Sequence, residues 1–456
     1  MRRVVKVSRI RIIITIIVVV LTTLLTGCTG KEPNEIAYVV ALGIDSTDDD
    51  NYKITIQYAN TTQKSGGTSE SGGKAGSEIV DNVTIEAPNI YAGVGLANNI
   101  VSKSFSMSHA KLIVFSKEMA EKGVKDMIET LVRSEEIRPD VFIAVANTTA
   151  NDYLTSVNPE MEVNPAQYYQ LIYQKNQLVG IPDGQLREFF TGLYTDNYDS
   201  ILPVAGVIEG SGGNSQNDDK GQSKDGQNEG SEGSSESLDS FESKSSNEKD
   251  ENEKEKDAEK NTSKYEYDIK NYIGGETTIE KKNKAEAIGA AVFEKDKMVG
   301  ELGEVETEIC KMLKGDYTYS YLTYYNNDTP DIPITVKTTQ QKKPKYKIDT
   351  DKKTVDIELY IESDLYSLPA DYNVENKIED FERDVANYTS SACTEFINNF
   401  TKKYNSDILK LNEKVKYKFL TNNQYNWFKK NVGWSEYKFS VCTNFKVRRT
   451  GLIVRE

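Results

Sequence analysis

Alternating apolar and polar side chains predict strands along much of the chain. The clearest case is residues 354–362, where every second side chain from Val355 to Ile361 is apolar and most of the others are acidic. A period of two is typical of a strand with one buried face. This period, or a short apolar run bounded by turn residues, predicts further strands at 38–45, 53–59, 83–86, 109–115, 141–146, 204–208, 287–293, 298–300, 317–325, 334–339 and 437–447. A polar turn joins the first two of these, so we expect a hairpin there.

A period of three to four residues predicts helices between these strands. It runs through Ile90, Val94, Ala97 and Val101 and returns over 124–132, 305–313 and 376–404. A helix-start signal at Asn164 and Pro165 begins a further predicted helix. Strand and helix patterns that alternate in this way indicate an α+β protein, with mixed sheets flanked by helices.

One internal segment differs from the rest in composition. Residues 209–262 hold sixteen acidic residues and seven lysines, with Leu238, Phe241 and Ala258 as their only apolar side chains. Such a segment cannot bury enough apolar surface to offset the entropy of ordering it, so we expect a disordered acidic linker. It separates an N-terminal α+β domain, 34–208, from a C-terminal α+β region, 263–456, which forms one body or two subdomains at 263–315 and 316–456.

The N-terminus has the layout of a secretory signal. Five basic residues precede an apolar run from Ile12 to Leu25, which is shorter than the ~20 residues that a membrane-spanning helix needs. The run ends in Leu25-Thr26-Gly27-Cys28, which resembles a bacterial lipobox. We expect cleavage after Gly27, removal of residues 1–27, and a diacylglyceryl lipid on Cys28, with 28–33 as a short tether. An uncleaved anchor and an ordinary signal with a coincidental cysteine are the alternatives.

Net charge restricts the partners of the mature chain. The full chain carries −15, and loss of residues 1–27 removes five positive charges to leave −20. A surface of this charge is unsuited to nucleic acid phosphates and is repelled by anionic lipid.

Motifs for catalysis and metal binding are missing from the sequence. Cys310, Cys393 and Cys442 form no CxxC pair, and we expect unpaired, buried or tolerated thiols. His109 is the only histidine, which excludes a multi-histidine metal site. It lies beside two serines and we expect a loop histidine rather than part of a catalytic triad. Residues 93–98 start like a dinucleotide loop but lack its third glycine, so we expect Gly95 to permit close helix packing. We therefore expect no enzyme, no metal and no cofactor beyond the covalent lipid.

Several blocks, taken together, resemble the Ger(x)C spore germination lipoproteins, the C subunits of nutrient germinant receptors. The matching blocks are 25–28, 41–45 with 52–57, 108–115, 133–138, 291–300, and a region around Trp427 and Trp434 followed by the terminal strand. The resemblance covers nearly the whole mature chain except the loop near Gly66 and the acidic segment. It implies a multi-domain α+β protein, anchored by Cys28 outside the inner spore membrane and assembled with two membrane-embedded subunits.

The resemblance directs attention to Arg133-Ser134-Glu135-Glu136-Ile137-Arg138, between a predicted helix and an apolar strand. Arg133 and Arg138 are fixed positive charges in an acidic protein. They either pair locally with Glu129, Glu135 or Glu136, or form a partner surface in which one guanidinium reaches a carboxylate of a membrane subunit. The expected function is thus that of a non-enzymatic receptor subunit. The alternative is a lipoprotein that binds solute for a transporter.

Overall fold

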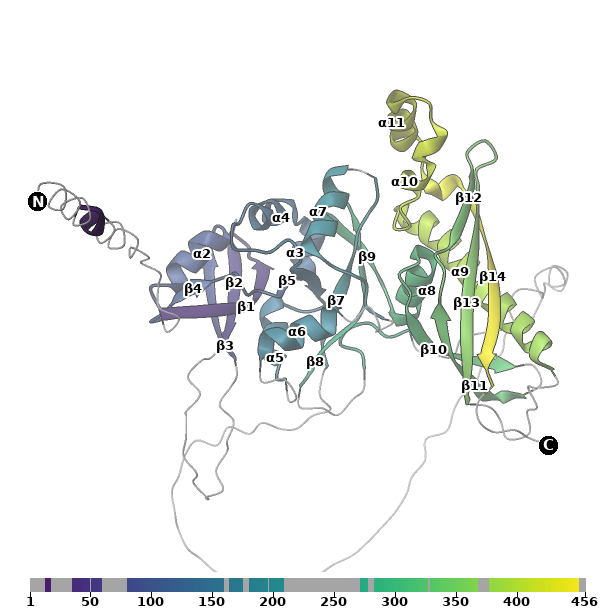
Figure 1. Ribbon diagram of the computed structural model, residues 1–456, viewed down its shortest axis with the longest axis horizontal. Helices are drawn as coiled ribbons and strands as arrows, with labels where there is room; N and C mark the ends of the chain where they lie inside the picture. The colour runs from purple at the N-terminus through teal and green to yellow at the C-terminus, as the bar shows by residue number, and fades with distance from the viewer. Residues whose placement is uncertain are drawn as a thin grey trace, which may run out of the picture. The chain divides into compact units, whose positions relative to one another are not determined.

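A computed structural model describes residues 13–17, 35–49, 51–59, 80–159, 164–174, 180–195, 197–208, 271–277, 283–326, 329–367 and 377–450. The expected lipobox with Gly27 and Cys28, the loop near Gly66 and the segment 209–262 lie outside these residues. Within them, two sheets each carry helices, and the α+β class with mixed sheets is confirmed (Figure 1).

The first sheet has nine strands, in the order β3-β2-β1-β5-β6-β7-β8-β9 with β4 paired to β1. Their bounds are β1 Ile36–Ser46, β2 Tyr52–Ala59, β3 Val80–Ala87, β4 Ser104–Ser106, β5 Leu112–Ser116, β6 Phe142–Ala146, β7 Ile201–Val207, β8 Ala285–Glu294 and β9 Lys297–Leu302. Strands β1, β5, β6 and β7 run parallel, and the others in the main path pair antiparallel, which confirms the predicted hairpin of β1 and β2.

Helices cover both faces of this sheet because its central strands are apolar on both sides. One core holds Ile113, Phe115 and Ile143 with helices α2 (Ile90–Ala97), α3 (Lys117–Lys122), α4 (Lys125–Val132) and α7 (Leu186–Thr195). The other holds Leu112, Val114 and Ala144 with α5 (Ala150–Ser156) and α6 (Pro165–Gln174). Neighbouring residues of β5 and β6 thus enter opposite cores, as expected of strands buried on both faces.

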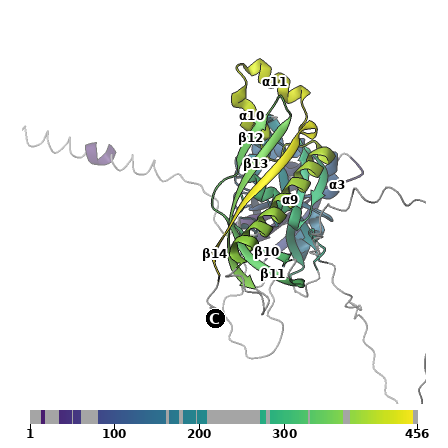
Figure 2. The same cartoon turned by 90° about the vertical axis from the view of Figure 1, so that its right-hand side faces the viewer.

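The second sheet has five strands around β13 (Thr354–Ser367). β11 (Thr329–Gln340) and β12 (Lys345–Asp349) pair antiparallel with β13, β10 (Tyr319–Asn326) pairs with β11, and β14 (Lys438–Arg449) pairs parallel with β13. The long helix α9 (Ile378–Tyr404) lies along β13 and β14 (Figure 2) and shares a core with α8 (Glu304–Lys314). The predicted alternation of β13 is confirmed, since Val355, Ile357 and Leu359 are fully buried.

A helical segment precedes β14. It comprises α10 (Leu411–Val415), the 3-10 turn η3 (Lys416–Lys418), α11 (Asn422–Asn431) and the turn η4 (Trp434–Glu436). Val415, Tyr425, Phe428 and Trp434 bury their side chains in the core of the second sheet, which fixes this segment against that sheet.

Strand pairing crosses the division that the acidic segment makes in the sequence. β7 ends before the segment and β8 begins after it, yet the two pair antiparallel, and the N–H of Ile208 donates to the carbonyl of Lys284 at 2.8 Å. The chain after residue 263 therefore contributes to both sheets. Composition marks where a segment lies in the chain, whereas strand order depends on long-range pairing that composition does not encode.

The predicted helix through Val101 is shorter than expected. α2 ends at Ala97, and its C-cap Asn98 holds the start of β4, since the Asn98 Oδ1 accepts the N–H of Phe105 at 2.8 Å. The close packing of this helix, predicted at Gly95, occurs at a different glycine. A Cβ on Gly93 would lie 2.7 Å from Ile54, whereas nothing lies within 4 Å of one on Gly95. The prediction for Gly95 was wrong, and Gly93 has that role.

The three cysteines are unpaired, as predicted. Cys310 and Cys393 are buried and Cys442 is exposed. Burial raises the pKa of the Cys310 thiol to about 11 and that of the Cys393 thiol to about 12. Both thiols therefore act as small apolar side chains rather than as nucleophiles.

Candidate interaction surface at the amino edge of the first sheet

The parallel strands of the first sheet begin at one edge, which we call the amino edge. β5 begins beside Ala41 of β1, and β6 begins beside Leu112 of β5. The loops that lead into β5 and β6, residues 107–111 and 133–141, therefore lie at the same edge, the first beside β1 and the second one strand further along the sheet. Two blocks far apart in the sequence, His109 and Arg133–Arg138, are brought together here.

The loop from Arg133 to Arg138 is held in place by its own side chains. Ser134 Oγ accepts the N–H groups of Glu136 and Ile137, each at 3.2 Å, and Ile137 is buried beneath the loop. The Glu136 carboxylate accepts the N–H of Met107 at 2.7 Å, which joins this loop to the one before β5. Glu136 is thereby a structural acceptor rather than a partner for the arginines.

The two arginines of the loop differ in their surroundings. Arg133 pairs with Glu129 one helical turn earlier at 3.2 Å, although its side chain is 79% exposed. Tyr194 of α7 also donates to Glu129, and this hydrogen bond raises the pKa of Tyr194. Arg138 is exposed, and no carboxylate in the described part of the chain lies within ion-pairing distance of it. Local pairing thus accounts for Arg133, whereas Arg138 has no such pairing among the described residues.

His109 lies on the outer side of the same edge. Its exposed ring packs edge-on against Tyr38 of β1, with centroids 4.7 Å apart, and its Nδ1 is 3.1 Å from Ser108 Oγ. Ser108 in turn contacts Ser106 at 2.9 Å. No carboxylate among the described residues is hydrogen bonded to the ring, so the third member of a catalytic triad is lacking there. The arrangement suits a polar, aromatic contact surface.

The block 41–45, also part of the family resemblance, stabilises the fold and does not contribute to this surface. Gly43 lets α5 approach β1, since a Cβ there would lie 3.0 Å from Leu154 and 3.1 Å from Ala150. Asp45 accepts backbone N–H groups at the start of that helix. Both residues lie at the opposite end of β1 from the amino edge.

A buried polar network on the other face was not anticipated from the sequence. Tyr153 and Tyr173 join hydroxyl to hydroxyl at 2.9 Å, and Gln57 donates to the carbonyl of Leu154 at 2.8 Å while accepting from Tyr169. Burial raises the pKa of Tyr153, Tyr169 and Tyr173 well above the ordinary range. These hydroxyls are therefore neutral donors that fix α5 and α6 to β2. The cluster of three tyrosines within residues 168–173 was the available signal.

Neither a membrane-spanning helix nor a metal-binding cluster is found in the part of the chain that the structure describes. No helix there combines the length and the apolar character needed to cross a bilayer. No group of three or more His, Cys, Asp or Glu side chains converges within the same residues.

Two protein-family models match this chain and divide it between them. The model described as "Spore germination protein N-terminal domain" matches residues 30–207, and "Spore germination B3/GerAC like, C-terminal" matches residues 288–451. Together they cover three quarters of the 456 residues.

Individual relatives carry related names. The chain is 26% identical to Spore germination protein KC of Bacillus subtilis (strain 168) over 174 residues, 35% of this chain and 42% of that protein. It is 30% identical to the putative spore germination protein YfkR of the same organism, over 32% of this chain and 37% of that protein. It is 24% identical to Spore germination protein GerQC of Bacillus cereus, over 41% of this chain and 50% of that protein. The matched stretches thus span half the length of these relatives or less.

Among solved structures, the crystal structure of the GerBC protein is similar at 15% identity and a TM-score of 0.48, covering 89% of this chain and 96% of that one. The two family models, in order and over most of the sequence, decide the assignment: the chain belongs to the Ger(x)C family of spore germination proteins.

Proposed function

We propose that this chain is a lipid-anchored, non-enzymatic subunit of a spore nutrient germinant receptor. It acts in the initiation of germination by assembling with membrane-embedded subunits. Its family, and relatives named as spore germination proteins, support this role. In this proposal Cys28 carries a diacylglyceryl lipid that holds the chain on the outer face of the cytoplasmic, inner spore membrane.

The position of the amino edge supports a partner surface close to the bilayer. Only residues 29–35 separate Cys28 from the start of β1 at Ile36, which makes eight residue steps from Cys28. Eight extended residues span at most about 28 Å. The first half of β1, with the His109 loop beside it and the Arg138 loop one strand further, is therefore within reach of the parts of a membrane subunit that project from the lipid.

Arg138 carries the proposal because it is a fixed, exposed positive charge without a carboxylate partner in the described chain. A guanidinium of this kind matches a carboxylate on another protein, and such a pair becomes stronger when an interface excludes water. The rigid loop presents it without the cost of ordering a flexible segment.

The two arginines provide a matched experiment on this assignment. Arg138→Ala should lose co-purification of the membrane-embedded subunits with no change in melting temperature, whereas Arg133→Ala should retain it. Retained co-purification in both variants, or lost co-purification together with a lower melting temperature, would contradict the assignment of Arg138 to a partner surface.

Lipidation is tested separately from assembly. Cys28→Ala should block lipid attachment, so the chain should remain unprocessed or leave the membrane fraction. Normal cleavage after Gly27 together with unchanged membrane retention would contradict the lipobox.

The alternative of a solute-binding lipoprotein receives less support. Transporter receptors of that class commonly use two similar α/β lobes around a cleft, but the two sheets here differ in strand number and order. Genes for membrane-embedded receptor subunits beside this one would favour the receptor, and genes for an ATPase and a permease would favour the alternative.

A further inference from the structure

The helical segment before β14 exposes large apolar side chains. Within residues 410–431, which we call the helical tip, Tyr417 is 91% exposed, Leu420 94% and Trp427 65%. Their neighbours Tyr425 and Phe428 are buried in the core of the second sheet. These buried side chains fix the tip to the second sheet, so its exposed side chains are not needed for that packing.

The tip is also strongly basic in an acidic protein. Residues 410–431 contain six lysines and a single acidic residue, Glu413, in a chain whose net charge is −15. Four of the lysines have partners within the protein: Lys410 pairs with Glu188 at 3.6 Å, Lys429 donates to Asn197 at 3.1 Å, and Lys414 and Lys418 donate to the carbonyls of Leu409 and Ile348. Lys416 and Lys430 are exposed, so a local positive surface surrounds the apolar side chains.

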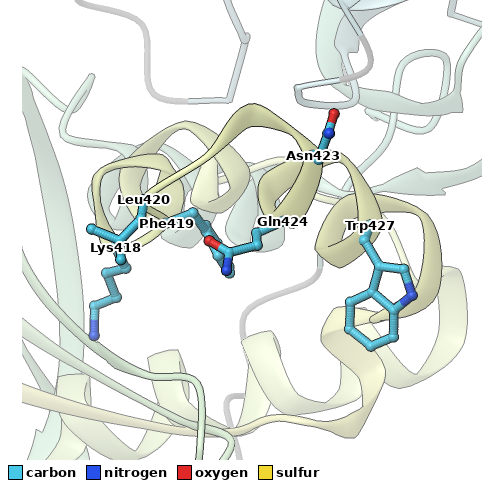
Figure 3. Close-up of a pocket in the computed structure, with 6 residues that line it drawn as sticks. All are labelled: Lys418, Phe419, Leu420, Asn423, Gln424 and Trp427. Atoms are coloured by element: carbon cyan, nitrogen blue, oxygen red, sulfur yellow. The ribbon is translucent and has the colours of Figure 1, made fainter.

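Polar and apolar groups share a shallow hollow on the tip. It measures about 630 Å³ and is lined by Lys418, Phe419, Leu420, Asn423, Gln424 and Trp427. The Trp427 ring lies on one side of this hollow, with Lys418 and Leu420 on the other (Figure 3). The Gln424 amide lies between them and supplies a donor near Lys418, whereas the Asn423 side chain points away from the hollow (Figure 3).

Hydrogen bonds place the tip next to the turn that precedes β7. Asn197 accepts from the Tyr425 hydroxyl at 3.2 Å as well as from Lys429, and Asp199 accepts the N–H of Asp407 at 2.8 Å. β7 begins at Ile201 and runs parallel to β6, so this turn belongs to the amino edge. The same edge carries the start of β1, which continues from the chain after Cys28.

We propose that the helical tip is a second membrane contact, lying in the headgroup layer of an anionic bilayer. Tryptophan and tyrosine favour the membrane–water interface, and lysines beside them are attracted to anionic headgroups. Each lysine near such a surface strengthens binding roughly fivefold. The positive charge of the tip attracts anionic lipid, whereas the acidic remainder of the protein is repelled by it.

A bilayer fits these side chains better than an acidic peptide does. Leu420, Tyr417 and Trp427 project separately and are mostly exposed, which suits insertion between lipid headgroups. A peptide-binding groove would instead hold its apolar anchors partly enclosed. The inference rests on the proposed anchoring at Cys28, which brings the chain to a bilayer in the first place.

Tryptophan fluorescence tests this contact in the mature, lipidated chain. The protein has two tryptophans, and Trp434 is only 4% exposed, so a lipid-dependent signal comes from Trp427. In vesicles of phosphatidylcholine and phosphatidylglycerol, we expect bromine-labelled acyl chains to quench its emission and the emission maximum to shift to the blue. Both effects should weaken in pure phosphatidylcholine or at high salt, and both should vanish in Trp427→Phe.

Charge variants separate the tip from the rest of the surface. Lys416→Ala with Lys430→Ala should weaken the quenching, consistent with about a 25-fold loss of binding if the two charges act independently. Lys125→Ala with Lys402→Ala, two exposed lysines elsewhere, should leave it unchanged.

Flotation of the protein with the vesicles reports the anchoring independently. A chain that floats without any Trp427 response would overturn the inference while leaving the proposed function intact. A response that appears only when membrane-embedded subunits are present would also overturn it, by assigning the tip to an acidic protein partner. A chain that does not float would contradict the anchoring itself.

Discussion

The carboxylate of Asp45 accepts the backbone N–H of Ala150, with Oδ1 2.6 Å from the nitrogen. Its second oxygen accepts the N–H of Asn151 at 3.2 Å. These are the first two donors of α5, which have no acceptor within the helix. Asp45 ends the β1 block that carries the family resemblance, so part of that resemblance reflects how the sheet holds its helix.

Removal of this acceptor should destabilise the first sheet. Asp45→Ala leaves two N–H groups without their acceptor, and we expect the free energy of unfolding to fall by about 1–3 kcal/mol. Asp45→Asn keeps one carbonyl oxygen and should cost less. Chemical denaturation measures both, with Asp48→Ala, an exposed acid three residues on, as a control within roughly 0.5 kcal/mol of wild type. Equal stability of Asp45→Ala and the control would contradict the role of Asp45.

The sequence predicted the larger elements because their signals are local. The strands around residues 38–45 and 354–362 and the helix at 376–404 each bury one regular face, and each is present in the structure. Helices α3, α5 and α7 and strands β4 and β12 were not predicted, and all of these except α7 have seven residues or fewer. α5 has a local N-cap in Thr149, whose Oγ1 accepts the N–H of Asp152 at 3.0 Å, but its second cap, Asp45, is 105 residues away in sequence and no local pattern reveals it.

The glycines of α2 also show that a local sequence pattern does not determine a tertiary contact. Their spacing suggested close packing at Gly95, but the direction of the helix face is set by tertiary contacts with β2. Gly93→Ala should cost roughly 1 kcal/mol because its methyl group would press on buried Ile54. Gly95→Ala has open space and should stabilise the helix by roughly 0.5–1 kcal/mol. Thermal melts of the two variants should therefore shift in opposite directions, and shifts of the same sign would refute this assignment.

The candidate surfaces were predictable to different degrees. The loop from Arg133 to Arg138 was placed correctly between a helix and a strand, and Glu129 was named among the partners of Arg133. The helical tip was missed, although its excess of lysines is visible in the sequence. Tyr425 and Phe428 enter the core while Trp427 and Leu420 remain outside, and only the packing of α10 and α11 decides which aromatic residues are exposed.

Asp407 should make stability depend on pH. It is buried, its oxygens accept the N–H groups of Leu411 and Asn412 at 2.7 and 2.8 Å, and burial raises its pKa from 3.8 to about 7. Nearby Asp199 adds to this increase, while Lys414 and the two hydrogen bonds oppose it.

The sign of the effect follows from where the proton binds more tightly. The folded state holds the Asp407 proton more strongly than the unfolded state, so this contribution is fully present below about pH 4. It is lost as pH rises towards 7, by up to roughly 4 kcal/mol. Denaturation at several pH values should therefore show a smaller loss across this range in Asp407→Asn than in wild type. Glu413→Gln, at an exposed acid of α10, is the control, and identical profiles for all three proteins would rule out Asp407 as the source.

The last prediction concerns the acidic segment between β7 and β8. Because Ile208 and Lys284 are joined by a hydrogen bond, the connection begins and ends at one place in the first sheet. The chain also returns to this sheet at residues 271–277, where the N–H of Gly274 donates to the carbonyl of Ile288 at 2.9 Å, so the connection spans 209–270. Deletion of residues 211–261 shortens it about sixfold, which changes the loop-closure free energy by only about 1.5 kcal/mol. We expect the melting temperature and membrane association to remain close to those of wild type. Replacement of the same residues by a Gly/Ser stretch of equal length separates the effect of length from that of composition.

Proteolysis within the segment tests the same relationship in the intact chain. Pairing of β7 with β8 should keep the two fragments together, so the nicked protein should elute as one species in size-exclusion chromatography and separate only in denaturant. This differs from two independent bodies, which composition alone would suggest, because β8 and β9 belong to the first sheet. Fragments that separate without denaturant, or a deletion variant that fails to fold, would show that the segment contributes more than a connection.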